Sequence, residues 1–281
     1  MAYAYPSEGS LDYFPCHYGT SKLVFRGPKK SLLKPYIAAI GGTETYGKFV
    51  PVPYPAVLES AGYSVVNLGW MNAGPDVFLN EPEVLDIACG ADLTVVQVLA
   101  AQNLSNPFYT VHPRRNDRFL RASTRLQNLY KEVDFTEFHF TRHMLQSLHQ
   151  ASPHRFVEVA TTLQATWVDR MGQLLRAVRG PRLLLWMGDN APPQSSAGAN
   201  PYTNSVLVNA TMIEQARAHA TAYLEVVASH EASTEAMEAK AFSAMERPAA
   251  QGVPGPLAHK EVAAALAAAI DQLLGPQAMH A

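Results

Sequence analysis

Polar residues that suit acyl chemistry or ligand binding follow an apolar run near the amino end of the chain. Residues 37–40 lead into a double glycine, and Thr43, Glu44 and Thr45 come directly after it. A hydroxyl such as that of Thr43 attacks a carbonyl only when a base lies within hydrogen-bond reach. Two interpretations follow. Thr43 is a nucleophile with Glu44 and Thr45 beside the substrate, or Thr43 caps a helix and Glu44 is solvated.

A basic segment further along the chain could hold an anion. His112 is followed by three arginines, Arg114, Arg115 and Arg118. Guanidinium groups match the oxygens of carboxylate, phosphate or sulfate. His112 is also a candidate base, because catalytic triads are defined by geometry and not by chain order. The alternative is a solvated basic surface whose arginines pair with carboxylates of the same chain.

Two further clusters carry groups that bind ligands. Asp189 follows the apolar run 182–187, and it can contact a ligand hydroxyl or cap a loop. His139 and His143 lie one helical turn apart, close to Glu137. A metal needs a third ligand and usually a water, and the His-Glu-x-x-His pattern is missing. Half-buried helix histidines are the alternative, so we predict neither a metal nor a cofactor.

These side chains need a scaffold, and short apolar runs bounded by glycine predict its buried strands. Strands are expected at 37–40, 64–69, 93–99 and 182–187. Helices are expected at 54–59, 82–89, 156–178, 209–228, 232–245 and 257–274. This alternation predicts an α/β fold, a flavodoxin-like parallel sheet of about five strands flanked by helices. The loops at 42–43, 69–72 and 102–103 should then converge on one pocket at the carboxyl edge of the sheet.

The pattern changes in two regions, which sets the expected domain organisation. Residues 1–35 are rich in aromatic, prolyl and basic residues, and they predict an arm that packs on the core. Residues 36–281 predict a single α/β domain. Within that domain, residues 107–160 break the strand–helix alternation directly after the third strand, so we expect a helical insertion there.

Composition excludes several classes of protein. Hydrophobic residues make up 48% and charged residues 16%, which indicates a real core. The formal charge of −2 argues against binding to nucleic acid or to an anionic membrane. No segment has the ~18 apolar residues of a membrane span, and residues 1–8 lack the features of a signal peptide. Cys16 and Cys89 are expected to be reduced and unpaired in a cytoplasmic protein.

The first loop resembles a motif of the SGNH (GDSL-type) esterase superfamily. In those enzymes a strand is followed by Gly-Asp-Ser-x-Thr-x-Gly. Here Gly41, Thr45 and Gly47 match, Thr43 takes the place of the nucleophilic serine, and Gly42 takes the place of the aspartate. The resemblance implies that any nucleophile of this chain is Thr43.

Two more loops extend the resemblance. The superfamily's second block, Asn-x-Gly-x-x-Gly, is matched by Asn67, by Gly69 and by Asn72 or Gly74, and it implies that the amide of Gly69 helps to form an oxyanion hole. The third block, Gly-x-Asn-Asp, implies that Gln102 or Asn103 supplies the second amide donor.

The carboxyl end departs from the superfamily. The usual Asp-x-x-His would fall near Ala250 and Val253, and neither residue type is present there. Residues 258–263 resemble the start of the helix that follows, in which His259 takes a position that is usually structural. The chain also looks like members of an uncharacterised bacterial family.

The resemblance implies an esterase or acyltransferase that acts on an acylated or anionic small molecule or a saccharide. The alternative is a catalytically altered relative that binds or modifies such a ligand without serine-type hydrolysis. A structural or partner-binding protein is a third class, and a homo-oligomer is compatible with all three. The predicted catalytic residues are Thr43, Gly69, Gln102, Asn103 and His112. The predicted substrate contacts are Glu44, Thr45, Asn72, Arg114, Arg115, Arg118 and Asp189.

Overall fold

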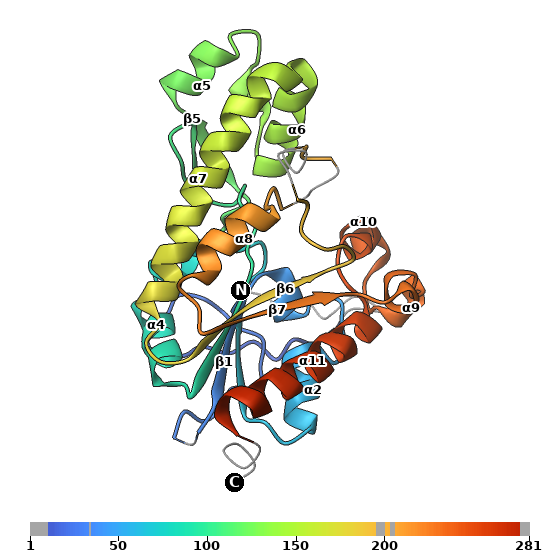
Figure 1. The fold of residues 1–281 in the computed structure, drawn as a ribbon. Helices are drawn as coiled ribbons and strands as arrows, with labels where there is room; N and C mark the ends of the chain where they lie inside the picture. The colour runs from blue at the N-terminus through green and yellow to red at the C-terminus, as the bar shows by residue number, and fades with distance from the viewer. Residues whose placement is uncertain (1–10, 34, 195–199, 203–205, 276–281) are drawn as a thin grey trace.

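The computed structural model describes residues 11–33, 35–194, 200–202 and 206–275. It contains a parallel sheet between two layers of helices, with a helical extension at one end (Figure 1). Among the described helices, none is long and apolar enough to cross a membrane. Cys16 and Cys89 are both free, as the sequence predicted.

The main sheet has five parallel strands in the order β2-β1-β3-β6-β7. The strands are β1 (Ile37–Gly41), β2 (Val65–Gly69), β3 (Leu93–Gln97), β6 (Arg182–Gly188) and β7 (Ala222–Val227). This is the flavodoxin-like order, so the predicted fold class is confirmed. Ile40 lies opposite Leu68 in β2 and Val96 in β3, which brings the carboxyl ends of these strands to one edge.

Alternate residues of each strand face opposite layers, as the period of two requires. Ile37 and Ala39 face the layer formed by α2 (Tyr54–Ser60) and α11 (Pro256–Leu274). Ala38 and Ile40 face the other layer. That layer contains α3 (Pro75–Leu79), α4 (Pro82–Gly90), α7 (Pro153–Ala177) and α8 (Ala210–Arg217). Each large apolar side chain that is fully buried here stabilises the fold by about 1.5–3 kcal/mol.

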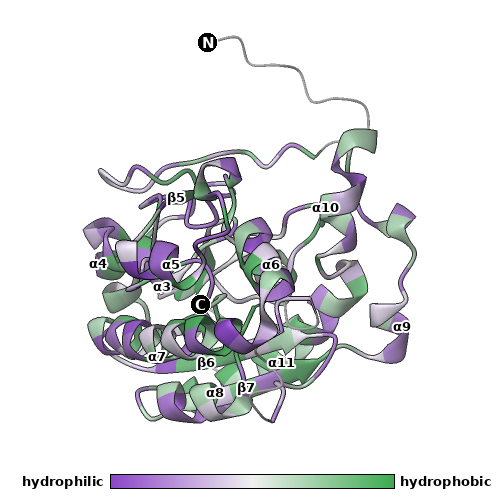
Figure 2. Ribbon diagram, turned by 90° about the horizontal axis from the view of Figure 1, so that it is seen from above, coloured by the Kyte–Doolittle hydropathy of each residue, from purple (hydrophilic) through white to green (hydrophobic). Residues whose placement is uncertain are grey.

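The hydropathy of the elements fits these layers (Figure 2). β6 and α11 are mostly hydrophobic, whereas α7 carries both hydrophilic and hydrophobic residues along its length. Helix α7 buries residues such as Leu163, Trp167 and Leu174 and leaves its other side polar. It is an amphipathic helix that covers the sheet with one stripe.

The segment after β3 forms the extension seen in Figure 1. An antiparallel hairpin of β4 (Tyr109–Val111) and β5 (Phe119–Ala122) comes first, and the sequence did not predict it. Then follow α5 (Thr124–Leu129), the 3-10 turn η1 (Phe135–Glu137) and α6 (Thr141–Ala151). The side chains of Ser123 and Ser152 cap α5 and α7, so both helices begin where their sequences allow.

Two helix predictions near the carboxyl end were wrong. The helix expected at 209–228 ends at Arg217, and the fifth strand, β7, occupies its second half. β7 contains Tyr223 and two valines, whose preference for a half-buried sheet surface overrides the alanines before them. The helix expected at 232–245 is replaced by short turns, namely α9 (His230–Ser233), η3 (Met237–Ala239) and η4 (Ala244–Glu246), followed by α10 (Arg247–Gln251). The side chains of Ser229 and Ser243 cap α9 and η4, so this stretch forms separate short helices and not one long helix.

The amino-terminal arm contacts the core through buried aromatic residues. Tyr18, Leu23 and Phe25 belong to the main hydrophobic cluster. Arg26 donates hydrogen bonds to backbone carbonyls in the segment that follows α1 (Thr43–Tyr46), including those of Val50 and Pro51. The arm therefore supports the loop that follows the first strand.

Candidate functional site

A cavity of about 980 Å³ opens at the carboxyl edge of the sheet. The loops after β1, β2, β3 and β6 line it, together with the first turn of α6 and residues 248–254. The order of the strands reverses between β1 and β3, and this switch point is where open α/β sheets bind ligands. All three loops that the sequence singled out contribute residues to this cavity.

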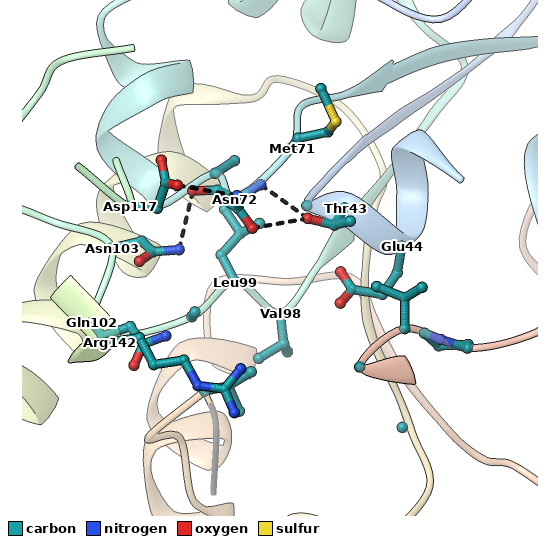
Figure 3. A pocket seen from close by; sticks show the side chains of 18 of the residues that line it. Thr43, Glu44, Met71, Asn72, Val98, Leu99, Gln102, Asn103, Asp117 and Arg142 are labelled. Carbon is teal, nitrogen blue, oxygen red and sulfur yellow. Dashed lines mark hydrogen bonds between the residues drawn. The ribbon is translucent and has the colours of Figure 1, made fainter. Parts of the chain in front are cut away.

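Thr43 is the first residue of α1, directly after β1 and its glycines. Its hydroxyl accepts a hydrogen bond from the amide of Asn72 at 3.0 Å and donates one to the Asn72 side-chain oxygen at 3.3 Å. The other end of that side chain donates from Nδ2 to Oδ2 of Asp117 at 3.2 Å. Figure 3 shows the resulting chain from Thr43 through Asn72 to Asp117. A carboxamide does not take up a proton near neutral pH, so Asn72 cannot activate the hydroxyl.

Asp117 is a half-buried carboxyl group that lines the cavity. Burial raises its pKa, whereas its own backbone amide, Arg118, Asn72 and Arg115 act in the opposite direction. In the sequence, the acidic residues of this segment were predicted only as partners for arginines. Only the hairpin, which returns the chain to the loop after β2, reveals Asp117 as a cavity residue.

A buried glutamine at the end of β3 organises the first loop. Oε1 of Gln97 accepts hydrogen bonds from the Gly42 amide at 2.9 Å and from the Thr45 hydroxyl at 2.6 Å. Its Nε2 donates to Oε2 of Glu44 at 2.8 Å. The Thr45 hydroxyl also bonds to the hydroxyl of Tyr54 at 3.0 Å. Thr45 is therefore buried in a structural network and, contrary to the prediction, does not line the cavity. Glu44 does line it.

Gly69 does not take the predicted oxyanion role. Its amide donates to Oδ1 of Asn67 at 2.9 Å, and Gly69 is absent from the residues that line the cavity. A Cβ at this position would lie 2.2 Å from the backbone nitrogen of Tyr46. The glycine thus allows β2 and α1 to pack closely, which explains its presence in the loop.

Gln102 and Asn103 both line the cavity, as expected, although they differ in their contacts. Asn103 donates from Nδ2 to the Asn72 carbonyl at 3.0 Å and accepts from the Thr141 hydroxyl at 3.1 Å. It therefore ties the loops after β2 and β3 to the start of α6. Gln102 is buried, and its Oε1 has no hydrogen-bond partner among the described residues.

The basic segment lies away from the cavity, contrary to the prediction. None of His112, Arg114, Arg115 and Arg118 is among the lining residues. Nδ1 of His112 accepts hydrogen bonds from the amides of Arg114 and Arg115, both at 3.2 Å, so this histidine closes the turn of the hairpin. Arg118 stacks on the ring of Phe140, 4.4 Å from its centre. The tight turn between β4 and β5 directs these side chains elsewhere.

The first turn of α6 supplies two basic groups, of which Arg142 was not predicted as a site residue and His143 was considered only as a metal ligand. Arg142 and His143 line the cavity, and Phe140 forms part of its wall. His139 is not among the lining residues. No group of three metal-binding side chains exists in the part of the chain that the structure describes. Asp189, predicted as a substrate contact, lies at the cavity and is exposed.

The region where the superfamily carries its catalytic histidine is apolar here. Val253 lines the cavity, and Lys240 fixes this loop by donating to the carbonyls of Ala250 and Val253. His259 lies behind the loop, where its Nδ1 accepts a hydrogen bond from the Tyr54 amide at 3.1 Å. Burial lowers the pKa of His259 to about 3, so the ring is neutral and structural.

The fold and the cavity define an α/β protein of flavodoxin-like topology with a ligand-sized pocket at the switch point of its sheet. Residues 1–274 match the family described as a domain of unknown function, DUF6473, and the chain belongs to this family. Among solved structures it is similar to "The crystal structure of carbohydrate acetylesterase family member from Sinorhizobium meliloti", with 12% sequence identity and a TM-score of 0.43. That similarity covers 86% of this chain and 99% of the other. No curated protein matches.

Proposed function

We propose that the cavity binds a saccharide or a similar hydroxyl-rich small molecule, and that the protein does not hydrolyse esters through Thr43. The absence of ester hydrolysis through Thr43 is supported by one observation, the pairing of Thr43 with Asn72. Both hydrogen bonds of the hydroxyl go to the backbone and side chain of one asparagine. Nucleophilic attack needs a base at that position, and an amide is not a base.

The lining of the cavity supports a hydroxyl-rich ligand. It combines carboxylates with carboxamides, that is, acceptors with groups that both donate and accept: Glu44, Asn72, Gln102, Asn103, Asp117, Gln146, Asp189 and Asn190. A sugar hydroxyl also donates and accepts, so it can satisfy either kind of group. Phe140, which is 43% exposed, offers an aromatic surface to the apolar side of a sugar ring.

The volume of the cavity is also suitable. Ligand pockets for small molecules measure roughly 300–1,000 Å³, and the cavity of about 980 Å³ lies at the upper end of this range. A monosaccharide or short oligosaccharide would fit, with its polar groups toward the loops after the strands. Three of those loops are already joined to each other through Asn72 and Asn103, which favours a preformed site.

The second candidate is the esterase or acyltransferase that the sequence suggested. The position of Thr43 at the start of α1, and the carboxyl group of Asp117 with its raised pKa two hydrogen bonds away, favour it. In this scheme the ester carbonyl would lie over Thr43, and Asn72 would have to move for a base to reach the hydroxyl.

A fluorophosphonate probe separates the two candidates. We expect no labelling of Thr43 in the native protein or in Thr43→Ser, because neither hydroxyl has a base beside it. Labelling of either one, located by peptide mass spectrometry, would favour the hydrolase.

Sugar binding is tested independently by saturation-transfer NMR with millimolar D-glucose and D-galactose. We expect transfer to at least one sugar, and its loss in Gly252→Trp. Gly252 lines the cavity, and the nearest atom to an added Cβ is the Ala249 carbonyl at 3.8 Å, so the indole fills the cavity without straining the backbone. Absence of transfer to every sugar tried would contradict the proposal.

A further inference from the structure

We propose that Arg142, the first turn of α6 and the buried carboxamide of Gln102 form a subsite for a carboxylate, and that the ligand is an acidic saccharide of the hexuronate type. This inference rests on the proposed saccharide binding and narrows it to a class of ligand. It places the anion-binding group on α6 and not in the basic segment of the hairpin.

Arg142 is the cation at this cavity that has no partner. It makes no hydrogen bond or ion pair with any residue that the structure describes, and it is exposed. The ammonium group of Lys48, which also lines the cavity, pairs with Glu246 at 3.6 Å. A guanidinium group binds a carboxylate through two parallel hydrogen bonds, which fixes orientation as well as charge.

The helix that carries Arg142 adds two backbone donors. α6 has 11 residues, and its N-cap residue Phe140 provides no side-chain cap. The amide of Thr141 donates to the Asp117 carbonyl at 2.9 Å, and that of Met144 donates to the Phe140 carbonyl at 3.1 Å. The amides of Arg142 and His143 have no partner within the described ranges. Free amides and the helix dipole make such a first turn favourable for a negative charge.

Gln102 supplies an independent indication that a ligand binds here. It is only 8% exposed, and its Oε1 has no hydrogen-bond partner among the described residues. A buried acceptor without a donor is unfavourable, because it has lost its hydrogen bonds to water without a replacement. Figure 3 shows Gln102 and Arg142 on the same side of the cavity, away from Thr43 and Glu44. A hydroxyl next to a carboxylate would therefore satisfy Gln102 while the carboxylate meets Arg142.

The balance of charge favours a carboxylate over a doubly charged phosphate. Among the described residues, the cavity has the carboxyl groups of Glu44, Asp117 and Asp189 and one unpaired guanidinium, that of Arg142. A singly charged, planar group matches one guanidinium fork, whereas a dianion would face an excess of negative charge. A hexuronate presents one carboxylate beside several hydroxyls. The carboxylate can bind Arg142, and the hydroxyls can bind the carboxyl and carboxamide groups of the cavity.

The test compares acidic and neutral sugars of the same stereochemistry. Binding of D-glucuronate, methyl D-glucuronate and D-glucose, and of the matching galacto series, is measured by calorimetry with the full-length protein at low salt. We expect the preferred uronate to bind at least tenfold more tightly than its methyl ester and its neutral parent. Arg142→Gln should reduce that preference to less than threefold through weaker binding of the uronate.

Two further variants make the result specific. Arg118→Gln removes a neighbouring arginine that does not line the cavity, so it should retain the full preference for the uronate. Gln102→Leu should weaken the uronate and its neutral parent alike, by about tenfold, because it removes the acceptor for a shared hydroxyl.

The outcomes distinguish this inference from the proposed function. Equal binding of acidic and neutral sugars, or a preference that survives Arg142→Gln, would overturn the carboxylate subsite while saccharide binding stands. Failure of all sugars to bind would overturn the proposed function and this inference together.

Discussion

The cavity has two walls that use their polar side chains in opposite ways. On the sheet side, Gln97 accepts a hydrogen bond from the backbone of the first loop, and Thr43 and Asn72 hydrogen-bond to each other. On the side of α6, Arg142 has no partner among the described residues. Polar groups that satisfy each other hold the fold, and those left unsatisfied are available to a ligand. We therefore expect ligand binding at the first turn of α6 and not at Thr43, where the sequence predicted it.

Removing Gln97, the centre of the sheet-side network, should have the largest effect on the stability of the fold. Gln97 is 5% exposed and accepts from the Gly42 amide and from the amide and hydroxyl of Thr45. Gln97→Ala leaves buried donors without partners and should lower the free energy of unfolding by about 3 kcal/mol. Urea denaturation measures it. Gln146→Ala on the other wall is the matched control and should change stability by less than about 0.5 kcal/mol. Equal losses in the two variants would remove the distinction between the walls.

Acid should weaken the sheet side through His259. This ring supports Tyr54, whose hydroxyl joins the Gln97 network. Its pKa of about 3 in the folded protein lies below the ordinary 6.5, so the unfolded chain binds the proton more readily. Stability should therefore fall as the pH drops below about 6.5, by about 2–3 kcal/mol between pH 6 and pH 4. In His259→Gln this part of the loss should disappear from thermal melts recorded across that range. An unchanged slope would show that other groups dominate the acid response.

Two substitutions of Asn72 separate the contribution of its side chain to stability from that of its backbone conformation. Its φ of 55° lies in the left-handed region, and its side chain links Thr43 to Asp117. We expect Asn72→Gly to lose about 1 kcal/mol for the missing hydrogen bonds. Asn72→Ala should lose about 1 kcal/mol more, because alanine is strained at this φ. If both variants melt at the same temperature, the backbone at this position relaxes at no cost.

Arg142 should have the smallest effect on the fold. Arg142→Ala removes an exposed side chain without a partner in the described chain, so the free energy of unfolding should change by less than about 0.5 kcal/mol. A loss above about 1 kcal/mol in chemical denaturation would show that Arg142 stabilises the fold, and it would contradict the difference between the two walls.

The sheet could be predicted from sequence because its strands are short apolar runs with glycine at their ends. β7 could not, since its Tyr223 and Val226 are only half-buried and its Val227 is exposed, and all three follow an alanine-rich segment. Helical propensity alone favoured one continuous helix there. The fifth strand is defined by its pairing with β6, which no local pattern reveals.

The candidate site was predictable only in part, for a similar reason. The loops that contain Thr43, Asn72 and Asn103 follow strands directly, so the topology alone brings them together. Arg142 lies 39 positions after Asn103 in the chain, and it reaches the cavity only because the hairpin and η1 return the chain to the sheet edge. In the sequence, His112 lies nearer to the third loop than Arg142 does. In the structure, its ring accepts hydrogen bonds from the backbone of the hairpin turn.

The length of α7 has a consequence for the behaviour of the whole molecule in solution. Its 25 residues make a rod about 37 Å long, which runs from the sheet to the end of the extension. One part of the rod packs on the main sheet through Trp167, which donates to the Leu99 carbonyl. Beyond that contact the helix carries α5 and α6 away from the centre of mass. X-ray scattering should therefore give a radius of gyration above the about 19 Å expected for a compact chain of this length, and rotational diffusion should be anisotropic about the axis of α7.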